Sequence, residues 1–146
     1  MQIELAYPDD EGKIKRLLAE CKLPGEDITP AHLQHFLIAR DGAHLAGVFG
    51  LEIFGPVSLL RSLAVPARCR GRGIASQLTE KAEEHARSRG AEVTYLLTTT
   101  AEAVFARRTY HKVDRGAVPG VIGETAEFQD LCPVSAVCMV RHLGAE

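Results

Sequence analysis

The chain has 146 residues, which is enough for one domain with a hydrophobic core, and we expect a single domain over residues 1–146. Its 17 basic and 19 acidic residues give a net charge of −2, which argues against a general nucleic-acid binder. No apolar run approaches the roughly 20 residues that span a bilayer, and no basic segment followed by an apolar run opens the chain, so we expect a cytoplasmic protein that does not bind membranes.

The first part of the chain predicts a short strand and two helices. The strand covers residues 3–6, and Pro8-Asp9-Asp10 follows as a turn. Apolar residues then recur at helical spacing and predict one buried stripe, made of Ile14, Leu17, Leu18 and Cys21. Thr29 and Pro30 begin a second helix as its N-cap and first residue.

Three antiparallel strands follow in the middle of the chain. Residues 36–40 and 44–54 flank the dipeptide Asp41-Gly42, which is a strong hairpin signal between two apolar runs. A break at Gly55-Pro56 leads into a third strand over residues 57–65.

The second half predicts alternating helices and strands. A helix over residues 73–89 has one apolar line and an opposite polar face, which carries Glu80, Glu83, Glu84, Arg87 and Arg89. Residues 93–98 form a buried strand, and residues 100–108 a helix that turns Ala101, Val104 and Phe105 inward. This order requires at least one parallel strand pair.

The pattern weakens towards the carboxyl end. Residues 117–123 are expected to be irregular, residues 124–131 a short helix, and residues 136–142 a closing strand that could pair across a homodimer. We therefore predict an α/β (α+β) fold with a mixed, mainly antiparallel sheet flanked by helices.

The segment between the third strand and the long helix predicts an anion site. Helix N-termini present free N–H groups, and glycines such as Gly71 and Gly73 let the main chain approach a phosphate closely. Arg68, Arg70 and Arg72 add positive charge that suits a diphosphate. The segment completes neither G-x-x-x-x-G-K-[ST] nor G-x-G-x-x-G, and a solvated loop or a nucleic-acid contact is the alternative. Aromatic residues make up only 5% of the chain, so platforms for base stacking are scarce.

The pattern Arg68-x-x-Gly71-x-Gly73 resembles Q/R-x-x-G-x-G/A, the acetyl-CoA signature of the GNAT acetyltransferases. The resemblance implies a splayed strand pair that holds acetyl-CoA, with main-chain amides of residues 69–75 on the pyrophosphate and the main chain of residues 63–65 on the pantetheine. It implies that the Val65 amide polarises the thioester and that a small-molecule amine attacks it. The residues it assigns to acetyl-CoA are Leu63, Ala64, Val65, Arg68, Cys69, Arg70, Gly71, Arg72, Gly73, Ile74, Ala75, Thr98, Ala101 and Phe105.

Two positions depart from the family pattern. Thr98 stands where the family often has Asn, and Phe105 where a tyrosine commonly protonates the departing thiolate. Phenylalanine has no proton to give. Candidate donors are Tyr95, Tyr110, Cys132 and Ser135, although Tyr110 is also expected as a packed aromatic at a strand start.

Glu52 is a candidate general base because it interrupts an apolar strand, where a carboxylate should have a raised pKa. It could equally lie on a solvent-facing side of the strand. Arg61 could pair with Glu52 or hold an anionic substrate. We expect no metal site, and we interpret His32 and His35 as surface residues.

The runs over residues 95–107 and 127–139 are similar to small GNAT proteins encoded with arsenic-resistance genes. That similarity implies a role in detoxifying an amine-bearing compound or an arsenical. Cys132 and Cys138 could bind trivalent arsenic if they came together, or they could be ordinary core thiols. The expected function is an acetyl-CoA-dependent N-acetyltransferase, and the alternative is a non-catalytic acyl-CoA sensor, which the absence of a tyrosine at position 105 favours.

Overall fold

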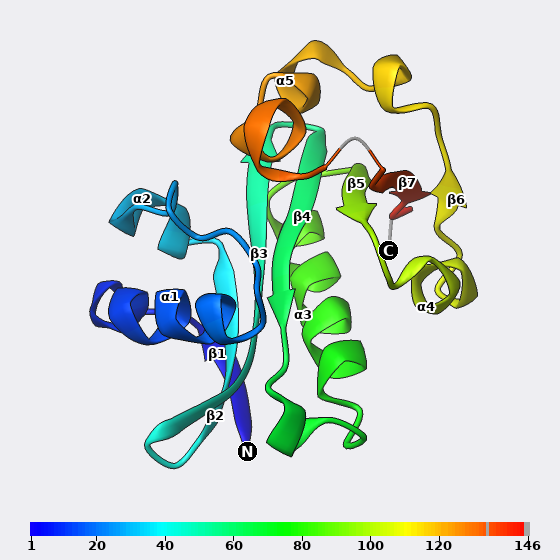
Figure 1. The fold of residues 1–146 in the computed structure, drawn as a ribbon. Coiled ribbons are helices and arrows are strands. Elements are labelled where there is room, and N and C mark those ends of the chain that lie inside the picture. Colours follow the sequence, from blue (N-terminus) through cyan, green and yellow to red (C-terminus); the bar gives the residue numbers. More distant parts are fainter. Residues whose placement is uncertain (134, 145–146) are drawn as a thin grey trace.

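Seven strands form one mixed sheet in the computed structural model, which describes residues 1–133 and 135–144 (Figure 1). The order across the sheet is β1-β2-β3-β4-β5-β7-β6, and of these neighbours β4 and β5 run parallel while the others are antiparallel. The strands are β1 (Gln2–Leu5), β2 (Phe36–Asp41), β3 (His44–Phe54), β4 (Val57–Ala64), β5 (Val93–Thr98), β6 (His111–Lys112) and β7 (Val137–His142). The predicted mixed, mainly antiparallel sheet is confirmed.

The helices cover both faces of this sheet. They are α1 (Glu11–Glu20), α2 (Pro30–Leu33), α3 (Ile74–Ser88), α4 (Glu102–Arg107) and α5 (Gly120–Gly123), with a π-helical turn η4 (Glu127–Leu131) after α5. Short 3-10 turns lie at η1 (Pro8–Asp10), η2 (Ala67–Cys69) and η3 (Arg115–Ala117). None of the helices in the described part of the chain combines the length and the apolar character needed to cross a membrane.

Strand β2 explains why the sequence of this sheet shows apolar runs instead of alternation. Its residues Phe36 and Ile38 belong to the core cluster formed with α1 and α2, and Leu37 and Ala39 belong to the cluster formed with α3. Successive strand residues point to opposite faces, so a strand covered on both sides is apolar throughout.

Strands β4 and β5 separate part of the way along their length. Their pairing ends at Leu60 and Leu96, whereas β4 continues to Ala64 and β5 to Thr98. On its other side β4 carries a bulge, because Gly50 pairs with Arg61 and Val48 with Ala64. The extra residue bends a strand at such a bulge, and Ser62 has a φ of +62°. The predicted V-shaped opening is therefore present between β4 and β5.

Several expectations for individual elements are wrong. Residues 117–123, expected to be irregular, contain α5, whereas the short helix expected over residues 124–131 is present as the π-helical turn η4. Val104 of α4 was expected to point inward, but it is 43% exposed. Glu83, expected on the polar face of α3, is 2% exposed. Strand β7 lies inside the sheet between β5 and β6, so it offers no full-length free edge to a second copy.

Candidate functional site

A cleft of about 630 Å³ opens where β4 and β5 diverge. The β4 side contributes a continuous run from Leu59 to Val65, the turn before α3 contributes Arg70, and the first turn of α3 contributes Ala75. The opposite wall is formed by the end of β5, by α4 and by the segment around η4. Of the predicted cofactor residues, those that line this cleft are Leu63, Ala64, Val65, Arg70, Ala75, Thr98, Ala101 and Phe105.

The turn at the mouth of the cleft leaves several N–H groups without a side-chain cap. Gly71 has a φ of +84° and Gly73 a φ of +76°, and a Cβ on either glycine would meet nothing within 4 Å. No side chain caps the N-terminus of α3, and no acidic residue lies in its first turn. The first N–H groups of a helix have no hydrogen-bond partner inside the helix and point away from its N-terminus. Together with the positive end of the helix dipole, they form a site that favours an anion.

Two of the predicted amide donors are already used by the protein. The N–H of Cys69 donates to Pro66 O at 2.8 Å, and the N–H of Arg70 donates to Ala67 O at 3.3 Å. The free donors therefore begin at Gly71 and not at Cys69. The side chain of Ile74 is 2% exposed and packs in the core, so this residue can offer only its backbone.

The three arginines of the turn do not converge, contrary to the prediction. Arg70 lines the cleft and donates from Nε to Val65 O at 2.9 Å. Arg68 instead pairs with Glu20 at 3.2 Å, and Arg72 lies 3.7 Å from Asp41. Of the three arginines in this turn, Arg70 is thus the one that lines the cleft.

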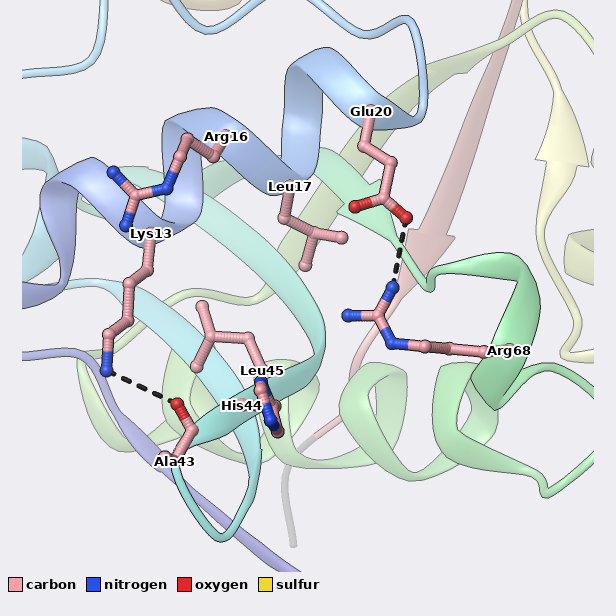
Figure 2. A pocket seen from close by; sticks show the side chains of 8 residues that line it. All are labelled: Lys13, Arg16, Leu17, Glu20, Ala43, His44, Leu45 and Arg68. Carbon is pink, nitrogen blue, oxygen red and sulfur yellow. Dashed lines mark hydrogen bonds and ion pairs between the residues drawn. The ribbon is translucent and has the colours of Figure 1, made fainter.

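Arg68 borders a separate cavity of about 290 Å³ between α1 and the β2–β3 hairpin (Figure 2). Its walls carry Lys13, Arg16 and His44 around the apolar side chains of Leu17 and Leu45. The Lys13 ammonium donates to Ala43 O at 3.4 Å, a long and weak contact. None of the residues that line this cavity is among those that line the cleft.

The wall of the cleft around Phe105 combines apolar side chains with the hydroxyl of Thr98. Phe105 is 4% exposed and packs edge-on against Tyr110 with ring centroids 5.4 Å apart. Thr98 Oγ1 accepts a hydrogen bond from the Ala101 N–H at 3.0 Å, which leaves its own O–H free to donate to a ligand. The wall therefore holds the predicted residues, but it presents no phenol at position 105.

Tyr110, a predicted catalytic residue, lies outside the cleft lining. Its hydroxyl donates to Glu83 Oε2 at 2.7 Å, and Glu83 Oε1 accepts from Arg108 at 2.9 Å and from Arg141 at 2.7 Å. Burial and the neighbouring Glu83 carboxylate raise the pKa of Tyr110 well above its ordinary value. The geometry gives Tyr110 a structural place in a buried ion network.

Arg61 is the first residue of β4 beyond its pairing with β5, and it is the centre of a buried charge cluster. Its side chain is 1% exposed, and Nη1 and Nη2 donate to the two oxygens of Asp27 at 2.6 and 2.7 Å. Nη1 also donates to Glu52 at 2.8 Å, and Nε lies 3.2 Å from Glu127 Oε1. Burial alone would lower the pKa of Arg61, but the bonds to Asp27 and the charges of Glu127 and Glu52 outweigh it and raise that pKa.

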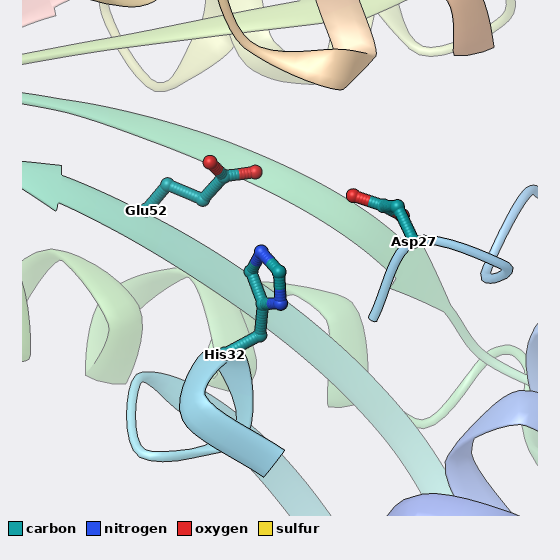
Figure 3. Close-up of side chains that lie close together, drawn as sticks. All are labelled: Asp27, His32 and Glu52. Atoms are coloured by element: carbon teal, nitrogen blue, oxygen red, sulfur yellow. The ribbon is translucent and has the colours of Figure 1, made fainter. Parts of the chain in front are cut away.

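Glu52, the predicted general base, pairs with Arg61 and does not line the cleft in the described part of the chain. It lies with Asp27 and His32, and one ligand atom from each of the three falls within 4.8 Å of the others (Figure 3). Arg61 already binds both carboxylates, so a cation there would compete with a buried guanidinium. We assign no metal to this group.

The sequence analysis did not identify Glu127 as a site residue. Glu127 lines the cleft, its side chain is 7% exposed, and its Oε2 accepts the thiol proton of Cys132 at 2.6 Å. Burial, and then this bond, raise the pKa of Cys132 to about 12, so the thiol stays protonated at neutral pH. A π-helical turn joins the two residues through a Cys132 N–H to Glu127 O bond of 3.1 Å, a five-residue spacing that a search for helical period does not test.

The chain matches one protein family in a comparison with known proteins. The profile described as "Acetyltransferase (GNAT) family" matches residues 4–114. No curated protein sequence matches the chain.

Several solved structures share the fold. N-acetylglutamate synthase from Neisseria gonorrhoeae, solved with coenzyme A and N-acetyl-glutamate, aligns with a TM-score of 0.84 at 20% identity over 99% of this chain and 35% of its own. A Mycobacterium tuberculosis protein solved with CoA aligns at 0.78 and 19% identity, over 97% of this chain and 99% of its own. Aminoglycoside 6'-N-acetyltransferase, solved with coenzyme A, aligns at 0.72 and 17%, over 100% and 99%. The chain thus spans about a third of the length of the Neisseria enzyme.

Proposed function

The chain belongs to the acetyltransferase (GNAT) family, and on that premise we propose that it transfers an acetyl group from acetyl-CoA to a primary amine of a small molecule. The observation that carries the proposal is the cleft between β4 and β5, which has the uncapped start of α3 at its mouth. An opening of this shape suits a long ligand with a charged diphosphate at one end.

The cofactor lies along the cleft in this proposal. Free N–H groups from Gly71 to Ala75 bind the pyrophosphate, and Arg70 adds the one guanidinium of this turn that lines the cleft. The pantetheine arm runs beside the exposed main chain of residues 63–65, which no longer pairs with β5. Solved structures with the same fold contain coenzyme A, which supports a CoA ligand here.

The reaction is a direct attack of the amine nitrogen on the thioester carbon. A main-chain N–H in the part of β4 that no longer pairs with β5 stabilises the oxyanion that develops on the carbonyl oxygen, a contribution of about 3 kcal/mol in comparable sites. The remainder comes from holding the two reactants in line within the cleft.

The acceptor enters near the segment around η4, which lines the wall opposite β4. The similarity to acetyltransferases encoded with arsenic-resistance genes makes amine-bearing organoarsenicals one candidate class. Cys132 and Cys138 are free thiols, but Cys132 is bonded to Glu127 and Cys138 is buried in the core. We therefore place the thiols in the protein's own packing and not in a paired arsenic site.

A CoA-release assay tests the proposal. The purified protein is supplied with acetyl-CoA and a panel of L-glutamate, kanamycin, spermidine and p-arsanilic acid, and free thiol is measured. We expect saturable release above the rate of hydrolysis with at least one amine. Failure to bind acetyl-CoA would end the assignment.

A sensor that binds acetyl-CoA without turnover is the second candidate. Phe105 places a phenyl ring in the cleft at the position where the family commonly has the tyrosine that protonates the departing thiolate. The same assay separates the two functions. A sensor binds acetyl-CoA in a calorimeter but shows no amine-dependent thiol release.

A further inference from the structure

We propose that Glu127, and not Glu52, is the catalytic carboxylate that takes the proton from the acceptor amine. This inference rests on the proposed function and assigns a group to a step of it. Among the described residues that line the cleft, Glu127 is the one carboxylate.

The position of Glu127 follows from the strand register. The cofactor enters at the open end of the V, beside Gly71, and its thioester is the part that reaches furthest towards the closed end. The closed part of the V, where β4 and β5 pair, ends at Leu60, and Arg61 is the first residue of the open part. Glu127 Oε1 is 3.2 Å from Arg61 Nε, so its carboxylate lies at the vertex where the thioester carbon and the amine meet.

Strand β4 is covered at this end by the segment that carries Glu127. The turn η4, drawn in orange, lies across β3 and β4 with α5 (Figure 1). Phe128 of this turn packs with Leu59 and Ile122 in one buried cluster. Apolar packing of the neighbouring Phe128 therefore holds the backbone at Glu127 in place. The contacts with Arg61 and Cys132 hold its carboxylate.

Both partners leave the carboxylate able to accept another proton. An ionised carboxylate offers about four lone-pair positions. Arg61 faces Oε1 and the Cys132 thiol donates to Oε2, so each oxygen keeps one further position. A positioned base of this kind requires a fixed side chain with remaining acceptor capacity, and Glu127 has both.

Glu52 fails the same test on geometry. It binds the opposite part of the Arg61 guanidinium, at Nη1, together with Asp27. It lies beside His32 and not in the cleft lining (Figure 3). Its role is to balance the charge of Arg61.

The proton balance also accounts for the missing phenol at position 105. The amine nitrogen forms a bond to the thioester carbon and gives its proton to Glu127. The carbon–sulfur bond then breaks with its electron pair on sulfur, and the proton held by Glu127 passes to the CoA thiolate. The N–C and S–H bonds form, the C–S and N–H bonds break, and no second acid is required.

The test compares Glu127→Gln with Glu52→Gln, using acetyl-CoA and whichever amine of the panel above wild type turns over fastest. Both substitutions remove one negative charge from the same guanidinium, so a purely structural role predicts equal effects. We expect kcat to fall about 100-fold or more in Glu127→Gln, with the acidic limb of the pH–rate profile lost, and by less than about threefold in Glu52→Gln. The KM for acetyl-CoA should change less than about twofold in either variant.

A second variant guards against misfolding. In Glu127→Ala we expect added formate to restore part of the lost kcat, because a free carboxylate can occupy the emptied space. Activity of Glu127→Gln within about threefold of wild type, equal losses in both Gln variants, or no rescue by formate would each overturn the inference. If wild type itself binds acetyl-CoA and acetylates no amine, the proposed function fails first and this assignment with it.

Discussion

At the scale of single residues, Gly71 begins the run of N–H groups that we propose bind the diphosphate. Its φ of +84° disfavours any side chain, and an added Cβ would meet no other atom within 4 Å. Gly90 has a similar φ of +91° and equally open surroundings, but it follows the other end of α3. It therefore provides a matched control for backbone strain.

We expect Gly71→Val to weaken acetyl-CoA binding about tenfold or more, because a side chain would displace the phosphate from amides worth about 1.5–3 kcal/mol each. Both substitutions should lower the free energy of unfolding by about 1–2 kcal/mol, because valine disfavours a positive φ. Gly90→Val should nevertheless keep the wild-type affinity for acetyl-CoA. Calorimetric titration and thermal melts measure both. Unchanged affinity in a folded Gly71→Val protein would count against the pyrophosphate site.

Tyr110 is expected to matter for stability and not for chemistry. Tyr110→Phe removes the hydroxyl donor from the buried Glu83, and leaving such an acceptor short of a partner costs about 1–3 kcal/mol. Urea unfolding should show this loss, while kcat at 20 °C stays near that of wild type. A fall in kcat of about tenfold, about 1.4 kcal/mol of barrier, without loss of stability would restore the catalytic role that the sequence suggested.

The sequence predicted the cleft residues better than the charged residues around them. The spacing of the glycines indicated an anion site at Gly71 and Gly73, because turn positions are local features, and the family resemblance added Thr98. Glu83 was expected on an exposed face, because its partners Tyr110 and Arg141 are distant in the chain and only the folded sheet brings them together. Glu127 was missed for the same reason, since Arg61 reaches it across the fold.

At the scale of elements, the end of α4 carries a strained residue. Thr109 has a φ of +70°, is exposed, and donates its N–H to Ala106 O at 3.1 Å. A β-branched residue in this left-handed conformation costs about 1–2 kcal/mol relative to glycine. We expect Thr109→Gly to raise the free energy of unfolding by about 1 kcal/mol, measured in urea.

Thr100→Gly serves as the matched control, because Thr100 is also exposed but does not have a positive φ. It should be neutral or destabilising, since glycine adds freedom to the unfolded chain. A destabilised Thr109→Gly protein would show that the threonine side chain makes a contact worth more than the strain.

Elements with a clear local signal were predicted almost residue for residue. The strands β3 and β5 have the expected bounds, since a hairpin dipeptide or a glycine marks their ends. Prediction was weakest between Val113 and Pro133, where short turns pack α5 and η4 onto β4 through Ile122 and Phe128, whereas the expected closing strand is present as β7. Tertiary contacts and not periodicity determine these turns, so the acceptor side of the cleft could not be derived from the sequence.

At the scale of the whole molecule, several acidic groups hold their protons more tightly in the folded state. Burial raises the pKa of Cys132 to about 12 and of Cys138 to about 11, against an ordinary value of 9.0, and it also raises that of Tyr95. A raised folded pKa gives stability that is complete below the unfolded pKa and is lost as the pH rises towards the folded pKa.

We therefore expect the free energy of unfolding to fall steadily from about pH 9 upward. Urea unfolding at pH 8, 9 and 10 under reducing conditions measures this slope. Cys132→Ser removes one titrating thiol and should decline less steeply than wild type. A flat profile in wild type would contradict the burial of these groups.

In the proposed complex, acetyl-CoA occupies the cleft between β4 and β5, with its diphosphate on the amides that begin at Gly71. Titrating 15N-labelled protein with acetyl-CoA and following its amide resonances by NMR tests it most directly. We expect the largest shifts at Gly71, Gly73 and Val65, with little change around Lys13 and His44 in the cavity beside α1. Shifts confined to that second cavity, or no saturable shifts at all, would contradict the account.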